Sequence, residues 1–470
     1  MSPDALPLLM FAGLALFLFG GFPVAFVLGG LALGFGALAI ALGEFTFIQF
    51  FTIVPRIWGG IAESLILTAV PMFIFMGTML ERSGVAGELL RALELILARV
   101  PGGLGLAVTL MGTIMAATTG IIGASVVMMT LLALPAMLGA RYDPAFASGT
   151  VAAAGTLGIL IPPSIMLVVM ADLLSRSVGV LFFAALGPGL VLAALYAVYT
   201  LAVGWLAPAR APKPNRASLP ADRRTIARIM LAGFVPPVLL IALVLGSILL
   251  GWASPTEAAG VGAFGAMVLA LLARPMALPA DDSGRRFRPA LRAFPGLLRE
   301  VVERSALTGA MLFAIFIGAS AFSLVFRALG GDDAVLGVVE GLGLGPWGVL
   351  AVLMAIVFAL GFFFDWIEIT LIVLPIFAPI IDGLDFGDHV ARTDTLYWFA
   401  ILTAVNLQTS FLTPPFGFAL FYVKGAAPPS LRMETVWRGG VPFVVLQLIA
   451  LALVTAFPAL ALWLPRAALN

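Results

Sequence analysis

The sequence predicts an all-α membrane protein that crosses the bilayer many times. Of its 470 residues, 62% are hydrophobic and only 10% are charged, which is more apolar surface than a water-soluble chain of this length can bury. The apolar runs are roughly 16–25 residues long, which suits spanning helices and exceeds the strands of a membrane barrel. Several shorter apolar pieces fall in adjacent pairs, as in re-entrant hairpins and broken helices.

The chain opens with an apolar segment that lacks a basic region before it, so we predict a first membrane helix rather than a cleaved signal. The chain has no cysteine and one histidine, His389; disulfides, iron–sulfur clusters and multi-histidine metal sites are therefore excluded. We expect His389 to be a solvated loop residue. We expect Trp205, Trp252 and Trp398 to anchor the protein at the membrane interface.

Two basic loops predict the orientation. Residues 207–228 carry six basic residues and one acid, and residues 273–304 carry seven basic residues and four acids. Two apolar runs lie between the loops, so both loops face one compartment, which the positive-inside rule predicts to be the cytoplasm. Nucleic-acid binding by a basic patch is the alternative, but these short loops sit beside membrane spans. We therefore predict a lipid bilayer as the surroundings and no nucleic-acid partner.

An internal repeat divides the chain. "FIFMG" at 73–77 resembles "AIFIG" at 314–318, Gly103 falls on Gly343, and Pro135 falls on Pro375. "LIPPS" then falls on "LTPPF", with the insertion at 382–394 accounting for the longer offset. Paired repeats with interrupted apolar segments are typical of secondary transporters, whose sites lie near the membrane midplane.

We predict two inverted repeats, an N-terminal half at 1–207 and a C-terminal half at 229–470, joined by a basic cytoplasmic linker at 208–228. Each half is expected to contain one re-entrant hairpin and one broken helix. The hairpins are predicted at 103–139 and 346–382, and the broken helices at 145–175 and 395–424.

The breaks are marked by tandem prolines in "GTLGILIPPSIMLVVM" (155–170) and "NLQTSFLTPPFGFALF" (406–421). A proline has no N–H, so each pair is expected to free two backbone carbonyls four residues earlier. A free carbonyl in lipid costs several kcal/mol, and a hard cation, which prefers oxygen ligands, would satisfy it. The carbonyls predicted to be free are those of Gly158, Ile159, Ser410 and Phe411.

Each break is paired with a polar loop in the same half, because Ser125 of "TTGIIGASVV" falls on Asp365 of "GFFFDWIEI" at the repeat offset. We therefore predict one sodium site per half. The first site is predicted to contain Thr119, Ser125, Thr156, Gly158, Pro162 and Pro163. The second is predicted to contain Asp365, Glu368, Gln408, Ser410, Thr413, Pro414 and Pro415. No other metal and no cofactor are predicted.

Simpler interpretations stay open for these residues. A tandem proline also occurs at Pro236–Pro237 without a repeat partner, so such a pair can simply bend a helix. Asp365 and Glu368 could be an interfacial carboxylate pair without a ligand role, although acids inside spans are costly and are usually functional. The Ser125 hydroxyl could bond back to its own helix.

Four stretches together resemble one known family: "TTGIIGASVVMMTLLALPAML", "GTLGILIPPSIMLVV", "FFFDWIEITLIVLPIFAPI" and "QTSFLTPPFGFALFYVKGAAP". They resemble the large membrane subunit of TRAP transporters, the DctM-like or M subunit, and the likeness runs from about residue 8 to 460. The resemblance implies an elevator with scaffold and transport domains. Its hairpin tips would be near Thr119–Ser125 and Gly361–Asp365, and its unwound segments would be Gly155–Pro163 and Asn406–Pro415.

The resemblance also implies sodium-coupled import of an organic acid, typically a carboxylate, across the bacterial inner membrane. The implied partners are a periplasmic substrate-binding protein and a small four-helix membrane subunit, which we expect as a separate chain. The substrate would lie between the two polar loops. Hydroxyl and backbone N–H groups would hold its carboxylate, because neither break contains lysine or arginine. The predicted substrate residues are Ser125, Ser164, Asn406 and Thr409.

Three other functions are alternatives to a TRAP subunit. A stand-alone divalent-anion/sodium carrier that needs no binding protein is the main alternative. An enzyme is not predicted, because no cysteine or histidine–carboxylate cluster falls within a span. A channel would need rings of polar residues along a pore rather than two paired breaks.

Overall fold

The computed structural model describes the chain except for residues 1–4, 120–121, 214–228, 232, 278–286, 342, 415–416 and 470, and except for the side chains at 5, 117–119, 273–277, 287–290, 338–340 and 469. Every regular element of the described residues is a helix, which confirms the predicted all-helical class. Eight described helices are long and apolar enough to cross a bilayer, so the protein is a multi-pass membrane protein. These candidate spans are Val24–Leu42, Ile122–Gly139, Val178–Leu206, Ile229–Leu249, Pro255–Leu272, Leu291–Ala328, Trp366–Gly383 and Met433–Ala456.

Thirteen elements of the described residues precede the basic linker. They are α1 (Ala5–Phe19), α2 (Val24–Leu42), α3 (Phe47–Phe51), α4 (Ile53–Ile57), the π-helix η1 (Trp58–Ala62), α5 (Ala69–Arg82), α6 (Val85–Ile96), α7 (Gly103–Thr119), α8 (Ile122–Gly139), α9 (Pro144–Thr156), the 3₁₀ turn η2 (Leu157–Ile159), α10 (Ile165–Leu173) and α11 (Val178–Leu206).

The remaining described elements follow the linker. They are α13 (Val235–Leu249), α14 (Pro255–Ala277), α15 (Phe287–Ala328), α16 (Gly331–Gly341), α17 (Pro346–Leu360), α18 (Trp366–Gly383), the 3₁₀ turns η4 (Gly387–His389) and η5 (Arg392–Asp394), α19 (Thr395–Leu412), α20 (Phe418–Ala426), α21 (Met433–Ala456) and α22 (Ala459–Leu469). Pro236 and Pro237 fall in the first turn of α13. A missing N–H needs no intrahelical partner there, so α13 accommodates this proline pair.

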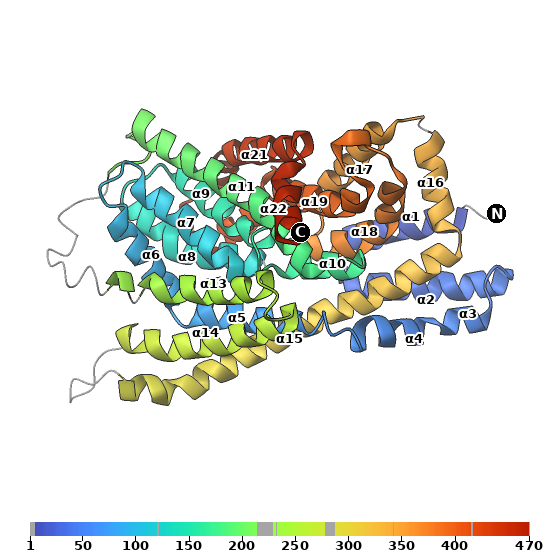
Figure 1. Cartoon of the computed structure of the whole chain (residues 1–470), viewed down its shortest axis with the longest axis horizontal. Coiled ribbons are helices and arrows are strands. Elements are labelled where there is room, and N and C mark those ends of the chain that lie inside the picture. Colours follow the sequence, from blue (N-terminus) through green and yellow to red (C-terminus); the bar gives the residue numbers. More distant parts are fainter. Residues whose placement is uncertain are drawn as a thin grey trace.

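The helices form two packed groups. The long helix α15 packs along α2 and α5, and α14 packs along α5 and α13. In the second group, α9 packs against α7, α8 and α21, and α19 packs against α17, α18 and α21. Figure 1 shows α13, α14, α15, α2 and α4 along the bottom of the molecule and α7, α9, α11, α19 and α21 above them. The second group contains both hairpins and both broken helices.

Small residues let α9 and α21 approach closely, although they come from opposite halves of the chain. A Cβ at Gly149 would collide with the backbone of Gly439, and a Cβ at Gly439 would collide with the backbone of Ala145. In membranes, close backbone packing replaces the hydrophobic effect as the source of helix association. These two glycines therefore allow α9 and α21, which belong to different halves of the chain, to pack closely beside the first break.

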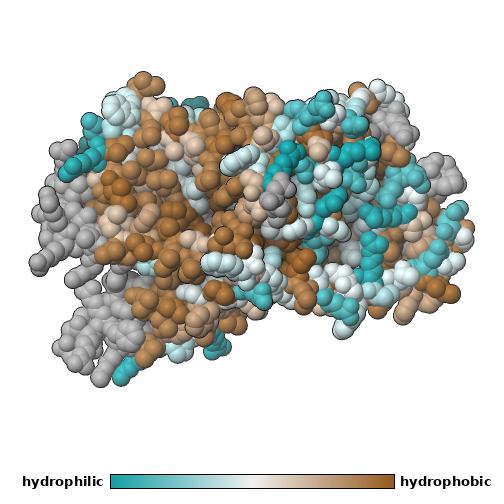
Figure 2. Space-filling view, in the orientation of Figure 1, coloured by the Kyte–Doolittle hydropathy of each residue, from teal (hydrophilic) through white to brown (hydrophobic). Residues whose placement is uncertain are grey.

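The surface matches a lipid environment. Large apolar side chains are exposed on many helices, including Phe26, Trp205, Leu239 and Phe264. Figure 2 shows hydrophobic surface across the left and centre of this face, with hydrophilic residues gathered toward the right. A monomeric soluble protein rarely exposes so large an apolar patch.

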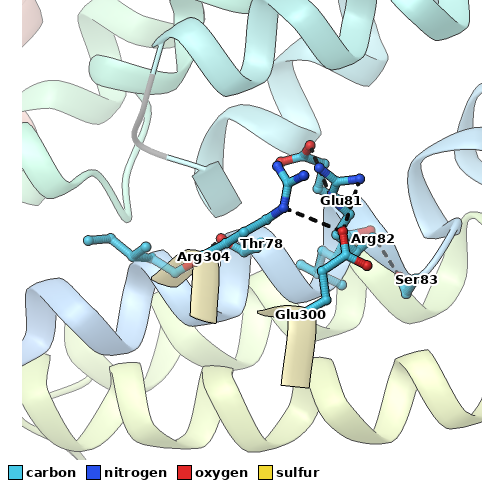
Figure 3. A network of polar contacts seen from close by, with 8 residues as sticks. Thr78, Glu81, Arg82, Ser83, Glu300 and Arg304 are labelled. Atoms are coloured by element: carbon cyan, nitrogen blue, oxygen red, sulfur yellow. Dashed lines mark hydrogen bonds and ion pairs between the residues drawn. The ribbon is translucent and has the colours of Figure 1, made fainter. Parts of the chain in front are cut away.

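A polar network joins α5 to α15. Glu300 lies 3.3 Å from Arg82 and 3.4 Å from Arg304, and Arg82 lies 3.9 Å from Glu81 on its own helix. Figure 3 shows these side chains converging between the two helices, with Ser83 next to them. One carboxylate therefore links a short helix of the first half to the long helix of the second.

Two predictions about single residues are wrong. Trp398 is fully buried rather than interfacial, and its Nε1–H donates to the Val454 carbonyl at 3.0 Å. His389 is not a solvated loop residue, because its Nε2 lies 2.8 Å from the Thr455 carbonyl and its ring packs against Trp347 and Trp398. The polar insertion folds back onto α21, a tertiary contact that local polarity does not reveal.

Candidate functional site

The first break separates α9 from α10. Helix α9 starts at the N-cap Asp143, whose side chain accepts the Phe146 N–H, and continues to Thr156. The chain then makes the 3₁₀ turn η2 and passes through Pro162 and Pro163 before α10 starts at Ile165. The whole passage is buried in protein, as irregular backbone at membrane depth must be.

Only one of the two carbonyls predicted to be free at this break lacks a hydrogen-bond donor. The Ile159 carbonyl is not free, because the Ser164 hydroxyl donates to it at 2.6 Å. Within the described residues, no donor reaches the Gly158 carbonyl. Thr156, fully buried, donates its hydroxyl to the Ala153 carbonyl at 2.9 Å. A hydroxyl that donates its hydrogen keeps oxygen lone pairs that can bind a cation.

The break lies against the hairpin of α7 and α8. A Cβ at Gly155 would come within 2.6 Å of the Val126 side chain and 3.0 Å of its Cα. Ser125, the residue before Val126, is buried on the second turn of α8. The structure therefore brings Ser125 and Thr156 to adjoining elements. The Thr119 side chain lies outside the described residues.

A buried polar cluster borders the first break, and the sequence patterns did not indicate it. The Tyr196 hydroxyl of α11 lies close to the Gln447 amide of α21 and to the Thr156 hydroxyl. All three residues are fully buried. The Tyr196 hydroxyl and both amide atoms of Gln447 lack a partner with hydrogen-bond geometry in the described structure. Burying such groups costs free energy unless water or an ion completes their bonds.

The second break is shorter than the predicted unwound segment Asn406–Pro415, because α19 remains helical to Leu412. The Ser410 carbonyl is not free, since the Thr413 N–H donates to it at 3.2 Å. Helix α20 starts at Phe418. Pro414 follows directly after Thr413, whereas Pro415 lies outside the described residues.

The polar side chains of α19 mostly bond within their own helix. The hydroxyls of Ser410, Thr413 and Thr409 donate to carbonyls three or four residues earlier, at 2.8, 2.7 and 3.3 Å. Asn406 differs, because its amide donates to the Met354 carbonyl of α17 at 2.7 Å. Asn406 therefore joins the second broken helix to the second hairpin.

Gln408 on α19 also differs from the side chains that bond within the helix. Its side chain is fully buried, and neither its amide nitrogen nor its amide oxygen has a hydrogen-bond partner among the described residues. A buried polar group left without a partner costs about 1–3 kcal/mol. A site that keeps such a side chain is therefore expected to hold water or a cation beside it.

The second hairpin turns at Gly361–Asp365, between α17 and α18. Asp365 is the N-cap of α18, and it forms a capping box with Glu368. Oδ1 of Asp365 accepts the Trp366 N–H at 2.7 Å, and Oε2 of Glu368 accepts the Asp365 N–H at 2.5 Å. The two acids thus have a structural role in starting the helix. In this capping box the Asp365 side chain also accepts the backbone N–H of Glu368.

This tip lies directly on the second broken helix. A Cβ at Gly361 would collide with the Ser410 hydroxyl. The absence of a side chain at Gly361 lets the tip approach α19 closely, which places the capping box next to the last turn of that helix. The hairpin and the break in this half therefore form one packed unit, as they do at Gly155 in the other half.

Tyr422 on α20 connects the two tips. A Cβ at Gly123, beside the first tip, would lie 3.0 Å from the Tyr422 ring and 3.2 Å from its hydroxyl. The same side chain is close enough to Asp365 and Glu368 to interact with their charges. It is 39% exposed. The sequence patterns did not single out Tyr422, because nothing local shows that α20 passes between the hairpins.

The comparison with known families agrees with this architecture. Residues 11–460 match the family model described as Tripartite ATP-independent periplasmic transporter, DctM component. The chain belongs to the DctM family. It is 33% identical to the C4-dicarboxylate TRAP transporter large permease protein DctM of Pseudomonas aeruginosa, over 86% of this chain and 87% of the relative.

A second DctM relative is named for another substrate. The ectoine/5-hydroxyectoine TRAP transporter large permease protein UehC of Ruegeria pomeroyi is 29% identical, over 88% of this chain and 89% of the relative. Among solved structures, the YdaH transporter of Alcanivorax borkumensis superposes with a TM-score of 0.58 at 14% identity, over 97% of this chain and 99% of that chain. That likeness concerns the fold alone.

The DctM membership makes the chain the large permease subunit of a TRAP transporter for an organic substrate. Among the described residues, no three histidine or acidic side chains come together as a metal site. Near the two breaks, the groups that could bind a cation are hydroxyl, amide, carbonyl and carboxylate oxygens.

Proposed function

We propose that this chain is the transmembrane pathway of a sodium-coupled importer of an organic acid, working in the bacterial inner membrane. A periplasmic binding protein would deliver the acid, and a small four-helix membrane subunit would complete the transporter. The family name, with its tripartite and periplasmic description, supports both partners. The observation that carries the proposal is the contact of each hairpin with a broken helix, at Gly155 and at Gly361.

The first sodium site is proposed between α8 and the end of α9. The Gly158 carbonyl, which has no donor among the described residues, and the hydroxyl oxygens of Thr156 and Ser125 would bind the ion, with Thr119 completing the site. Hard cations take such neutral oxygen ligands. Pro162 and Pro163 contribute by withholding the N–H groups that would otherwise occupy the break.

The second sodium site is proposed between the capping box and the end of α19. The carboxylates of Asp365 and Glu368 would supply charge, and Ser410, Thr413 and Gln408 would supply neutral oxygens. Pro414 and Pro415 would keep the chain from continuing as a helix. The sodium gradient can drive accumulation of the substrate. Each sodium ion that moves down a 100 mV potential releases about 2.3 kcal/mol before its concentration gradient is counted.

The acid is proposed to bind between the tips, where Tyr422 passes from one to the other. Hydroxyl and backbone N–H groups would hold its carboxylate, with Ser125, Ser164 and Thr409 nearest to the breaks and Asn406 fixing α19 to the hairpin. The two packed groups of helices fit an elevator. In that mechanism, the group that contains the hairpins would move against the group that contains α2, α5, α14 and α15.

The proposal is tested by uptake into proteoliposomes that contain this chain and the small subunit, with the binding protein outside. Radiolabelled C4-dicarboxylates and ectoine serve as the first substrates. We expect uptake that requires both an inward sodium gradient and the binding protein. Undiminished uptake with choline in place of sodium would overturn the coupling, and full uptake without any soluble partner would instead show a stand-alone carrier.

A further inference from the structure

A cavity of about 630 Å³ with charged lining residues lies between the two groups of helices. One wall comes from α4, η1 and α15, and the other comes from α10 and α18. Its charged and hydroxyl-bearing lining residues include Arg56, Asp172, Ser320, Ser323, Arg327 and Asp382. Neither the repeat nor the breaks predicted a site at this place.

The cavity leads toward the second tip. It follows one face of α18, from Leu371 to Asp382, a length of about 17 Å at 1.5 Å per helical residue. Leu371 is one helical turn beyond Glu368 of the capping box. The cavity therefore ends within a turn of the residues proposed to bind sodium.

The outer rim of the cavity is expected to face the periplasm. Asp172 and Ser175 stand at the end of α10, where Arg176 pairs with Asp382 at 3.7 Å. Helix α11 begins two residues later, at Val178, and runs to the basic linker at its other end. Its 29 residues make a helix of about 44 Å, so the linker and the rim lie on opposite sides of the bilayer. The basic linker is expected in the cytoplasm.

The two arginines stand on the same wall, and their positive charges repel one another. Arg327 donates to the Pro375 carbonyl at 2.5 Å and lies 3.5 Å from Asp332. Among the described residues, no side chain or carbonyl pairs with the Arg56 guanidinium. A positive charge without a counter-charge, in a cavity beside another guanidinium, attracts an anion.

The acids of the cavity belong to the opposite wall and have partners of their own. Asp382 pairs with Arg176, and Asp172 accepts the Ser64 hydroxyl at 3.2 Å. The electric field of these charges therefore points across the cavity, from the wall that contains Arg56 and Arg327 to the wall formed by α10 and α18. An anion is drawn to the first wall, and the serines at 320 and 323 offer hydroxyl donors beside it.

We propose that this cavity is an anion vestibule, in which Arg56 and Arg327 receive the carboxylate of the substrate from the periplasmic side before it reaches the hairpin tips. The proposal rests on the proposed import of an organic acid. Arginine suits this role because its planar guanidinium binds a carboxylate through two hydrogen bonds. Arg56 is the residue that holds the anion, and Arg327 is both a wall of the cavity and a tie to α18.

The absence of cysteine from the chain allows a direct test. Ser320 is replaced by cysteine in the full complex, and its modification rates by anionic sulfonatoethyl and cationic trimethylammonioethyl methanethiosulfonate are measured at low salt, where screening is weak. The ratio of the two rates, divided by the ratio for a small thiol in solution, reports the local potential. Ser323→Cys provides a second position if the first variant does not fold.

We expect the normalised ratio to favour the anionic reagent. Arg56→Gln should lower it about fivefold, because one charge several Å away acts in opposite directions on the two reagents. Asp172→Asn should raise it. Arg392→Gln serves as the matched control, because Arg392 is exposed in the loop that follows α18, and it should leave the ratio unchanged.

A normalised ratio of one or below, or a ratio that Arg56→Gln does not change, would overturn the vestibule. The outcome is separable from that of the proposed function. If the normalised ratio does not favour the anionic reagent while sodium-driven uptake is observed, only the vestibule proposal is refuted. If the ratio behaves as expected while sodium dependence fails, the anion site stands and the coupling falls. Slower modification in the presence of succinate, lost in Arg56→Gln, would add direct support for carboxylate occupancy.

Discussion

Replacement of Gln408 by methionine tests whether the buried polar groups at the second break exist to bind sodium. The side chain is fully buried, and both of its amide atoms lack partners in the described structure. Methionine has a similar length and no such polar groups. Without sodium, Gln408→Met should therefore raise the free energy of unfolding by about 1–3 kcal/mol, the usual cost of an unsatisfied buried group.

With sodium, the stability advantage of the variant should be largely offset. A ligand present at one hundred times its dissociation constant stabilises the folded state by about 2.7 kcal/mol. The wild-type chain should gain this stability as sodium chloride replaces choline chloride, whereas Gln408→Met should lose most of the gain. The assay is thermal unfolding of the purified full chain at a series of sodium concentrations and constant ionic strength.

Thr403→Val is the matched control for this experiment. Thr403 is also fully buried on α19, and its hydroxyl also lacks a partner among the described residues. It lies more than one helical turn before Gln408. This variant should stabilise the chain and keep the full sodium response. A Gln408→Met variant that melts higher and still shows the wild-type sodium response would refute the ligand role.

Three further changes probe the rest of the site and the fold. Asp365→Asn should keep the start of α18, since asparagine is also a good N-cap. It should raise the sodium concentration needed to activate uptake by about tenfold or more. Unchanged activation would assign Asp365 to capping alone. Gly361→Ala should abolish uptake in folded, membrane-inserted protein, because the added methyl group would displace the tip from Ser410. Gly383→Ala, whose added methyl group would meet no neighbour, should transport normally. Equal uptake by the two variants would contradict the tight tip contact. Glu300→Gln removes the two ion pairs that Glu300 makes, with Arg82 and Arg304. It should lower the free energy of unfolding by about 1 kcal/mol or less with normal sodium dependence. A loss of sodium coupling in this variant would mean that the network belongs to the transport mechanism.

Composition and apolar run length were sufficient to predict the helical membrane class, because the bilayer allows few alternatives to helices. The prolines located both breaks, since their chemistry acts within a few residues of the chain. What each freed carbonyl then does could not be predicted. The Ile159 and Ser410 carbonyls find new donors in Ser164 and Thr413, and those bonds depend on how each break folds.

Contacts between residues far apart in the sequence also could not be predicted. Tyr422 lies between the tips only because α20 packs on α8. The Gln447–Tyr196 cluster depends on three helices that meet beside the first break, and Arg56 and Arg327 line one cavity although 271 positions separate them (327 − 56). No local periodicity carries such information. The tertiary packing that joins the two halves creates these neighbours.

Substrate-driven sodium movement is the measurement closest to the central claim that the breaks and tips couple the two ligands. Proteoliposomes that contain this chain and the small subunit receive radioactive sodium outside, with the loaded binding protein added or omitted. Coupling at the paired breaks predicts that the loaded binding protein accelerates sodium influx severalfold and that Gln408→Met removes the acceleration. Sodium influx that is the same with and without the loaded binding protein, while the substrate itself is taken up, would contradict it.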